Sequence, residues 1–139
     1  MQGDLERPRS TTIGLRLLYV SLALGAANAL AGDFSVPPGV SATFVYVVVL
    51  AGLAVSGLLI FLIGTGRNWA RILYVALFLV SLPQTLPLAW EIATSLSHGP
   101  VWFALWLPQW PLFLVGVGLL FLPVSNAWFR AARARRRDH

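Results

Sequence analysis

The sequence predicts an all-α fold: an integral membrane four-helix bundle with both termini in the cytoplasm. Three observations predict it. Hydrophobic residues make up 58% of the 139 residues and charged residues only 11%, whereas about a quarter of the residues are charged in soluble proteins. Four apolar runs have about the 20 residues that a helix needs to cross a bilayer. All ten basic residues are arginine, and all fall on one side of the predicted membrane.

The four predicted spans follow one another in a single transmembrane domain. They cover residues 13–32, 42–64, 69–97 and 101–130, approximately, and a basic cytoplasmic tail covers 130–139. Each span must be helical, because an isolated strand would leave its backbone polar groups unpaired in lipid. The connections carry Pro37-Pro38-Gly39, then Gly64 and Gly66, then Gly99-Pro100. These residues are typical of turns and helix ends.

The distribution of arginine predicts the orientation. Arginines flank the first span, lie in the second connection and follow the fourth span, whereas the first and third connections hold Asp33 and His98 but no Lys or Arg. Basic residues in short loops stay on the cytoplasmic side. The use of arginine without lysine indicates a GC-rich bacterial genome, and therefore the bacterial inner membrane. The triplet Ala29-Leu30-Ala31 also imitates a signal-peptide cleavage site, although the apolar run is long for a signal core.

A polar and proline-rich cluster lies in the outer halves of the last two spans. The third span contains SLPQTLPLAWE, with Gln84 and Glu91 on one helical face, and the fourth contains Pro108-Gln109-Trp110-Pro111. The rise per residue places Gln84 and Gln109 at nearly the same depth, so the two amides can hydrogen-bond between antiparallel neighbours. The prolines should kink both helices.

Two interpretations of this cluster remain open. In the first, the glutamines pair in a dry seam and the prolines are simply tolerated. In the second, Gln84, Glu91, Gln109, Trp106 and Trp110 line an outward-facing cavity that suits a lipid headgroup or an organic cation. Paired amides would favour the first interpretation, and a hydrated cavity would favour the second.

The second connection reads GTGRNWAR, from Gly64 to Arg71. Gly64 and Gly66 can end a helix, and Asn68 is a good N-cap for the next helix. Arg67 and Arg71 lie one turn apart beside a helix N-terminus, where they can bind the phosphate of a lipid headgroup. The alternative is that every residue of this connection has only a structural role.

Small residues predict close helix packing. Ser21, Gly25 and Ala29 repeat every four positions in the first span, and Gly52 and Ser56 do so in the second. Such repeats allow two backbones to approach closely. We expect helix contacts at both surfaces, within one chain or between copies.

The GTGRNWAR hairpin and the SNAWFR segment before the basic tail form a recognisable pattern. It resembles small, mostly uncharacterised bacterial four-span inner-membrane proteins over about half the chain, from Leu62 to Arg130. The resemblance implies the four-span topology and no particular activity.

The residue inventory argues against enzymatic chemistry. The chain has no cysteine, and its histidines are His98 and His139, so no spacing resembles a metal site. We therefore expect no cofactor and no catalysis. The leading hypothesis is an accessory or interaction protein, as a subunit of a membrane complex or a protective, immunity-type protein; the alternative is a small oligomeric transporter or channel. Expected partners are anionic lipid headgroups at the cytoplasmic side, a membrane protein or a second copy, and not nucleic acid.

Overall fold

The computed structural model describes residues 6–31, 39, 41–95 and 100–135, without the side chains of residues 31, 84–95 and 100–103. This part of the chain contains five helices and no strand. The helices are α1 (Arg9–Ala31), α2 (Ala42–Gly64), α3 (Asn68–Ser95), α4 (Pro100–Leu120) and α5 (Pro123–Arg135). The predicted all-α class is therefore confirmed.

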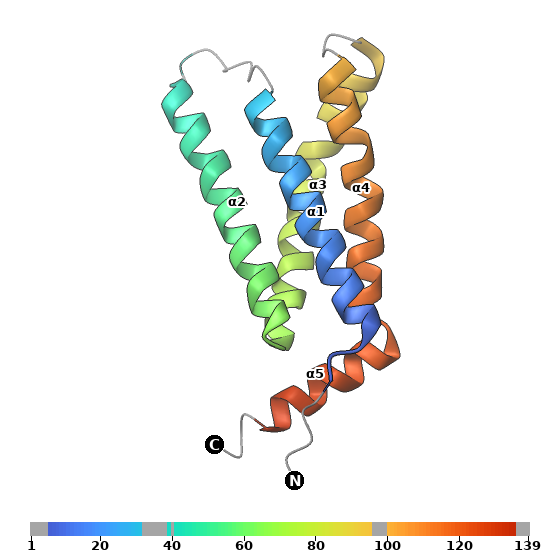
Figure 1. Ribbon diagram of the computed structural model, residues 1–139. Helices are drawn as coiled ribbons and strands as arrows, with labels where there is room; N and C mark the ends of the chain where they lie inside the picture. Colours follow the sequence, from blue (N-terminus) through green and yellow to red (C-terminus); the bar gives the residue numbers. More distant parts are fainter. Residues whose placement is uncertain (1–5, 32–38, 40, 96–99, 136–139) are drawn as a thin grey trace.

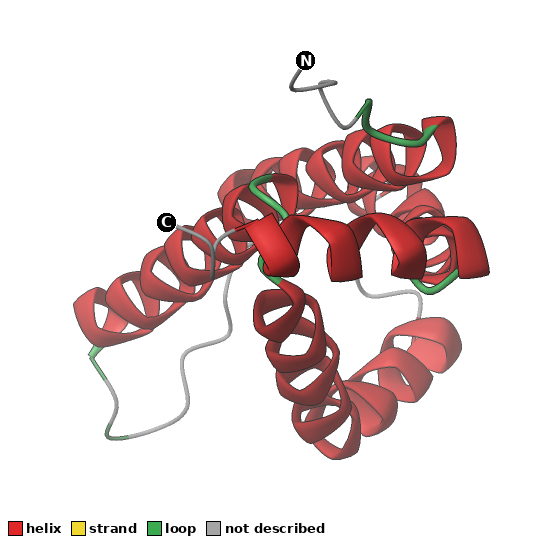
Figure 2. Cartoon of the chain, turned by 90° about the horizontal axis from the view of Figure 1, so that it is seen from below, coloured by secondary structure: helices red, strands yellow, loops and turns green. Residues whose placement is uncertain are grey.

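The four long helices run alongside one another, and α5 lies across one end of them (Figure 1). The view from that end shows α5 crossing in front of the others (Figure 2). In the described residues, α1 and α2 are long and apolar enough to cross a membrane. A third candidate exists if the bent pair Ala104–Leu120 and Pro123–Arg135 counts as one span, and Asn68–Pro83 is a shorter apolar helix.

The last predicted helix, 101–130, is wrong. The chain leaves α4 at Leu120 and turns by 60° before α5. Pro123 explains the break, because it has no N–H to donate to the carbonyl of Leu119 and suits the first position of a new helix. The hydroxyl of Ser125 donates to the Leu119 oxygen instead, at 2.8 Å. Part of the predicted basic tail, up to Arg135, consequently belongs to α5.

The predicted glycine signal at the end of α2 is confirmed. Gly66 adopts a positive φ of 79°, which glycine reaches without steric cost. The Gly66 N–H donates to Ile63 O at 2.9 Å, and the Arg67 N–H donates to Leu62 O at 3.2 Å. This pair of bonds is the Schellman arrangement, and it closes the helix.

The predicted N-cap at Asn68 is wrong. Asn68 is itself the first residue of α3, and the Ala70 N–H bonds to the carbonyl of Arg67. The side-chain oxygen of Asn68 is buried and has no hydrogen-bond partner. The tight turn at Gly66 therefore orients the chain into α3 without a side-chain cap.

Helix α1 packs most closely on α4. A Cβ atom placed on Gly14 would lie 2.9 Å from the backbone oxygen of Gly116, and one on Gly116 would lie 3.1 Å from the oxygen of Gly14. The two backbones are thus in direct contact, as small residues permit. Farther along α1, Ser21 and Gly25 also face α4. The predicted packing surface on the first span is therefore confirmed at Ser21 and Gly25, and its partner is α4.

Helix α2 is held mainly by its last turns. Its buried residues are Leu59, Ile60 and Ile63, all in the last two turns. A Cβ placed on Gly52 would meet nothing within 4 Å. The expected close approach is therefore absent at Gly52 within the described residues, and a contact between copies stays a prediction.

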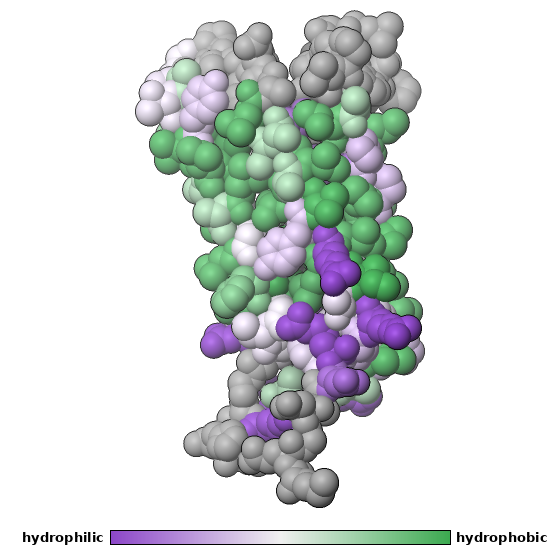
Figure 3. All heavy atoms as spheres, viewed as in Figure 1, coloured by the Kyte–Doolittle hydropathy of each residue, from purple (hydrophilic) through white to green (hydrophobic). Residues whose placement is uncertain are grey.

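Residues buried near the α5 end form the hydrophobic core. They are Leu15, Leu18, Leu59, Ile60, Ile63, Ala70, Phe113, Leu120 and Phe129. Hydrophobic residues cover most of the visible face between the two ends, and hydrophilic residues gather toward α5 (Figure 3). Among the described side chains, the packed core thus lies at the α5 end of the bundle.

Candidate functional site

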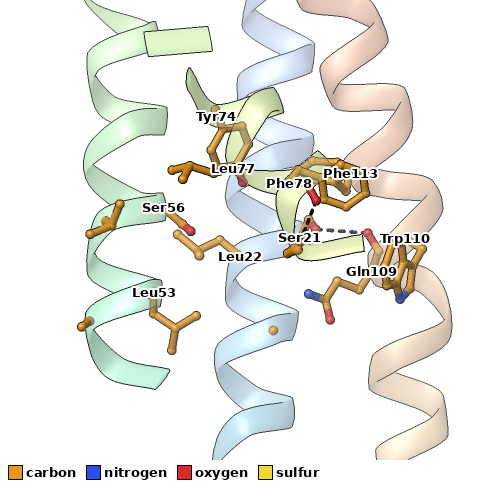
Figure 4. A pocket seen from close by; sticks show the side chains of 15 residues that line it. Ser21, Leu22, Leu53, Ser56, Tyr74, Leu77, Phe78, Gln109, Trp110 and Phe113 are labelled. Atoms are coloured by element: carbon orange, nitrogen blue, oxygen red, sulfur yellow. Dashed lines mark hydrogen bonds between the residues drawn. The ribbon is translucent and has the colours of Figure 1, made fainter. Parts of the chain in front are cut away.

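A cavity of about 560 Å³ lies among α1, α2, α3 and α4. Its size falls in the range of about 300–1,000 Å³ that is usual for ligand pockets. The lining residues come from all four helices: Ser21, Leu22, Gly25, Ala51, Gly52, Leu53, Val55, Ser56, Tyr74, Leu77, Phe78, Ser81, Gln109, Trp110 and Phe113. Most of these side chains are apolar, and the polar ones are uncharged (Figure 4).

One wall of the cavity is the contact between α1 and α4. The hydroxyl of Ser21 donates to the backbone oxygen of Gln109 at 3.1 Å. The side-chain amide of Gln109 lies over Gly25, where an added Cβ would be 2.8 Å from Nε2. The missing side chain at Gly25 therefore makes room for this amide beside α1.

A second wall consists of aromatic rings from α3 and α4. The rings of Phe78 and Phe113 lie 4.2 Å apart, and Phe78 meets Trp110 edge-on at 5.8 Å. Tyr74 packs against Phe113 at 5.7 Å. Such offset and edge-on ring pairs are favourable geometries. They connect α3 to α4 through long side chains, so the two backbones need not approach closely.

Three polar groups in the cavity have no hydrogen-bond partner among the described residues. In the described residues, the amide of Gln109 and the hydroxyls of Ser56 and Tyr74 make no hydrogen bond. Figure 4 shows them on three different helices, with Ser56 on α2 opposite Gln109 on α4. An unpaired amide or hydroxyl in apolar surroundings costs several kcal/mol. Water, a ligand or a side chain outside the described part of the structure can satisfy these groups.

The structure places the predicted outer-cavity residues in different ways. Gln109 and Trp110 line the cavity. Trp106 does not line it but packs edge-on against Trp110 at 6.0 Å. The side chains of Gln84 and Glu91 lie outside the described part of the structure, so their roles and the pairing of Gln84 with Gln109 stay predictions. The described contact of the Gln109 amide is with α1.

Sequence reasoning missed the inner part of the cavity. Tyr74 and Phe78 stand one turn apart on α3, and Phe113 follows Gln109 by one turn on α4. Their spacing of four places each pair on one helical face. That aromatic spacing was the available signal. Ser56 was expected to pack against another helix and instead lines the cavity.

The two arginines of the predicted phosphate site point to different places. Arg71 is only 8% exposed, and its Nη1 donates to the backbone oxygen of Leu120 at 2.8 Å. Its guanidinium group lies over the rings of Phe121 and Phe129, at 4.8 and 4.4 Å. Arg71 therefore ties α3 to the break between α4 and α5.

Arg67, by contrast, is exposed. It lines a second pocket of about 490 Å³ between the start of α3 and α5, with Gly66, Asn68, Trp69, Ile72 and Arg133. Sequence reasoning missed Arg133 as a neighbour of Arg67, because the helix break that brings α5 beneath α3 was not predicted.

Hydroxyl groups fix α5 against the start of α1. Ser125 donates its single hydroxyl hydrogen to Leu119 O, so Ser10 and Thr11 must both donate to the Ser125 oxygen, each at 3.0 Å. All three hydroxyls are thereby satisfied. On the same side, Arg7 donates to Gly64 O at 2.6 Å, where the α2 dipole favours a cation.

Within the described residues, no group of three or more His, Cys, Asp or Glu side chains can hold a metal ion. No protein-family model, curated protein or solved structure matches the chain. The resemblance to small bacterial four-span proteins therefore stays a prediction.

Proposed function

We propose that the chain is a multi-pass protein of the bacterial inner membrane with four crossings and both termini in the cytoplasm. The gathering of basic residues at the α5 end supports this orientation, because Arg67, Arg130, Arg133 and Arg135 are all exposed there. In this arrangement α5 lies in the cytoplasmic interface, with Phe129 turned inward and its arginines toward anionic headgroups. Arg67 and Arg133 are the proposed headgroup contacts, and Arg71 serves the packing beneath them.

Within that membrane, we propose a non-enzymatic accessory or interaction protein, as a subunit of a membrane complex or a protective, immunity-type protein. The observation that carries this proposal is the exposure of α2. This helix has no buried residue before Leu59. Its outer stripe is an unpartnered apolar face made of residues spaced three and four apart: Val47, Leu50, Ala54, Leu58 and Phe61. This spacing suits contact with another membrane helix.

Photo-cross-linking in native membranes tests the interaction hypothesis. A photoreactive amino acid at Leu50 should give one defined protein adduct, whereas the same group at Leu79 of α3 should give only lipid adducts. Leu50 and Leu79 are similarly exposed, at 59% and 56%, so the pair is matched. Lipid adducts alone at both positions would remove the accessory hypothesis.

The alternative is a small oligomeric transporter or channel, and the cavity with its unpaired polar groups favours it. In that case Gln84, Glu91 and Gln109 contribute to the pathway. Replacing Gln84 or Glu91 by alanine should abolish flux in reconstituted vesicles, while the helical content stays unchanged. Unaltered flux in both variants would exclude this pathway.

A further inference from the structure

The cavity between the long helices has a composition that selects one class of ligand. Its described lining contains no Asp, Glu, Lys, Arg or His. The described lining therefore offers an ionic ligand no counter-charge, and burying an unpaired charge is expensive. The occupant that this lining suits is therefore uncharged.

The three unpaired polar groups specify the polar part of the ligand. The Gln109 side-chain amide offers two hydrogen-bond donors and one acceptor oxygen. The hydroxyls of Ser56 and Tyr74 can each donate one hydrogen bond and accept another. A compact group that carries a hydroxyl and one or two carbonyl oxygens can satisfy them together. Leu22, Leu53, Leu77 and the neighbouring rings provide apolar surface for hydrocarbon attached to such a group.

The α2 wall leaves a route from the lipid phase. Ala51, Gly52 and Val55 line the cavity and are themselves exposed. Figure 4 shows α2 standing apart from α1 along this wall, with Leu22 and Leu53 between them. An acyl chain longer than the cavity can therefore extend past α2.

We infer that this cavity binds a neutral lipid with a small hydroxyl- and carbonyl-bearing head, of the diacylglycerol type. Gln109, Ser56 and Tyr74 hold the head, and the apolar walls hold the first part of the chains. The inference does not depend on whether the chain acts as an accessory protein or as a transporter. The cross-linking experiment on α2 can find no protein partner while the cavity still binds lipid. Equally, α2 can bind a protein partner while the cavity binds no lipid.

The probe is dioctanoylglycerol, which is short enough to remain largely inside the cavity, and the readout is thermal unfolding of the purified chain in mild detergent. A ligand that binds only the folded state raises the unfolding midpoint, by about 5 °C at saturating probe. The rise should saturate with probe concentration. Dioctanoylphosphatidylglycerol, which has similar chains and a charged head, should give a much smaller rise.

Gly52→Leu and Gly118→Leu provide the matched pair of variants. A Cβ at either position would meet nothing within 4 Å, but only Gly52 lines the cavity. Leucine at 52 should fill the site and remove the rise in midpoint, and leucine at 118 should leave the rise intact. Gln109→Leu, which removes the head contact and adds no bulk, should also reduce it.

The inference is overturned if dioctanoylglycerol gives no rise in the unaltered chain, which is the result expected when a second copy or another helix fills the cavity. It is also overturned if all variants show the same rise in unfolding midpoint, because the lipid then binds nonspecifically to the apolar surface and not in the cavity. An equal rise with the charged probe would contradict the neutral head.

Discussion

Helices α1 and α4 form a tight seam, whereas α1 and α2 form an open pair. In the seam, the backbones touch at Gly14 and Gly116, and hydroxyl and amide groups continue the contact as far as Gly25. In the open pair, α2 has no buried residue before Leu59, and a Cβ on Gly52 would meet nothing within 4 Å. The same residue type, glycine, thus serves helix contact in one place and an opening in the other.

This difference shows that the structural role of a small residue in a membrane helix depends on what faces it. Where a facing helix also carries a small residue, two glycines let backbones meet and dispersion contacts accumulate. Where no helix faces the glycine, the missing side chain leaves volume for a ligand or a partner. The seam is therefore the structural half of the molecule, and the open pair is the half suited to binding.

The largest effect should come from crowding the seam. In Gly14→Val, the new Cβ would lie 2.9 Å from a backbone oxygen of α4, so the helices must separate. We expect a loss of about 3 kcal/mol in unfolding free energy, at the upper end for overpacking. The measurement is unfolding by denaturing detergent titrated into mild-detergent micelles. Gly118→Val is the control, because it makes the same change in open space; equal losses in both would remove the backbone-contact argument.

A smaller loss should follow from the hydroxyl cluster at the foot of the seam. Ser125→Ala leaves the Leu119 carbonyl without its donor and the hydroxyls of Ser10 and Thr11 without their acceptor. Leaving buried polar groups unpaired costs about 2 kcal/mol. The same detergent titration checks it. Ala127→Ser, an exposed change on α5, should leave the free energy of unfolding nearly unchanged. If Ser125→Ala lost no more unfolding free energy than Ala127→Ser, the hydroxyl cluster would not stabilise the fold.

A substitution in the open pair should stabilise the chain, in contrast to the substitutions in the seam. Gly52→Ala places a methyl group where nothing lies within 4 Å, and alanine is up to about 1 kcal/mol better than glycine inside a helix. We expect a gain in unfolding free energy of that size or less. A loss comparable to that of Gly14→Val would mean that α2 closes on α1 in the membrane, and the comparison between the two helix pairs would break.

Much of this fold could be predicted from the sequence, and the reasons are physical. The length of the apolar runs gave the first three helices to within four residues at each end, because the thickness of lipid fixes that length. The break at Pro123 was missed because prolines are tolerated inside membrane helices, as Pro108 and Pro111 are inside α4. At the break, the Ser125 hydroxyl satisfies the carbonyl of Leu119.

The site was less predictable, because chain order suggested α3 as the neighbour of α4 and gave no sign of α1. The fourth span was expected beside the third, to which a short connection joins it, yet α4 packs most closely on α1. The facing glycines at 14 and 116 decide that choice, and they are about a hundred residues apart in sequence. Gln109 and Trp110 line the cavity, and Ser21 and Gly25, which complete this wall, come from the long-range pairing of α1 with α4.

The smallest predicted effect concerns Gly25, which lies on the α1 face toward α4 and also lines the cavity. Alanine there would bring its Cβ to 2.8 Å from the Gln109 amide nitrogen, the far end of a flexible side chain and not a backbone atom. The amide can move, so the strain and the helix-propensity gain should nearly cancel, leaving stability within about 0.5 kcal/mol of the unaltered chain.

A double-mutant cycle separates the two terms, because Gln109→Ala removes the amide that must move. In that background Gly25→Ala should stabilise by up to about 1 kcal/mol, the full propensity gain. The difference between the two backgrounds measures the contact between Gly25 and Gln109. If Gly25→Ala instead destabilised the chain equally in both backgrounds, the α1 backbone itself would be in close contact with α4 at this level. The tight seam would then continue past the cavity, and the Gln109 amide would have no freedom to meet a ligand.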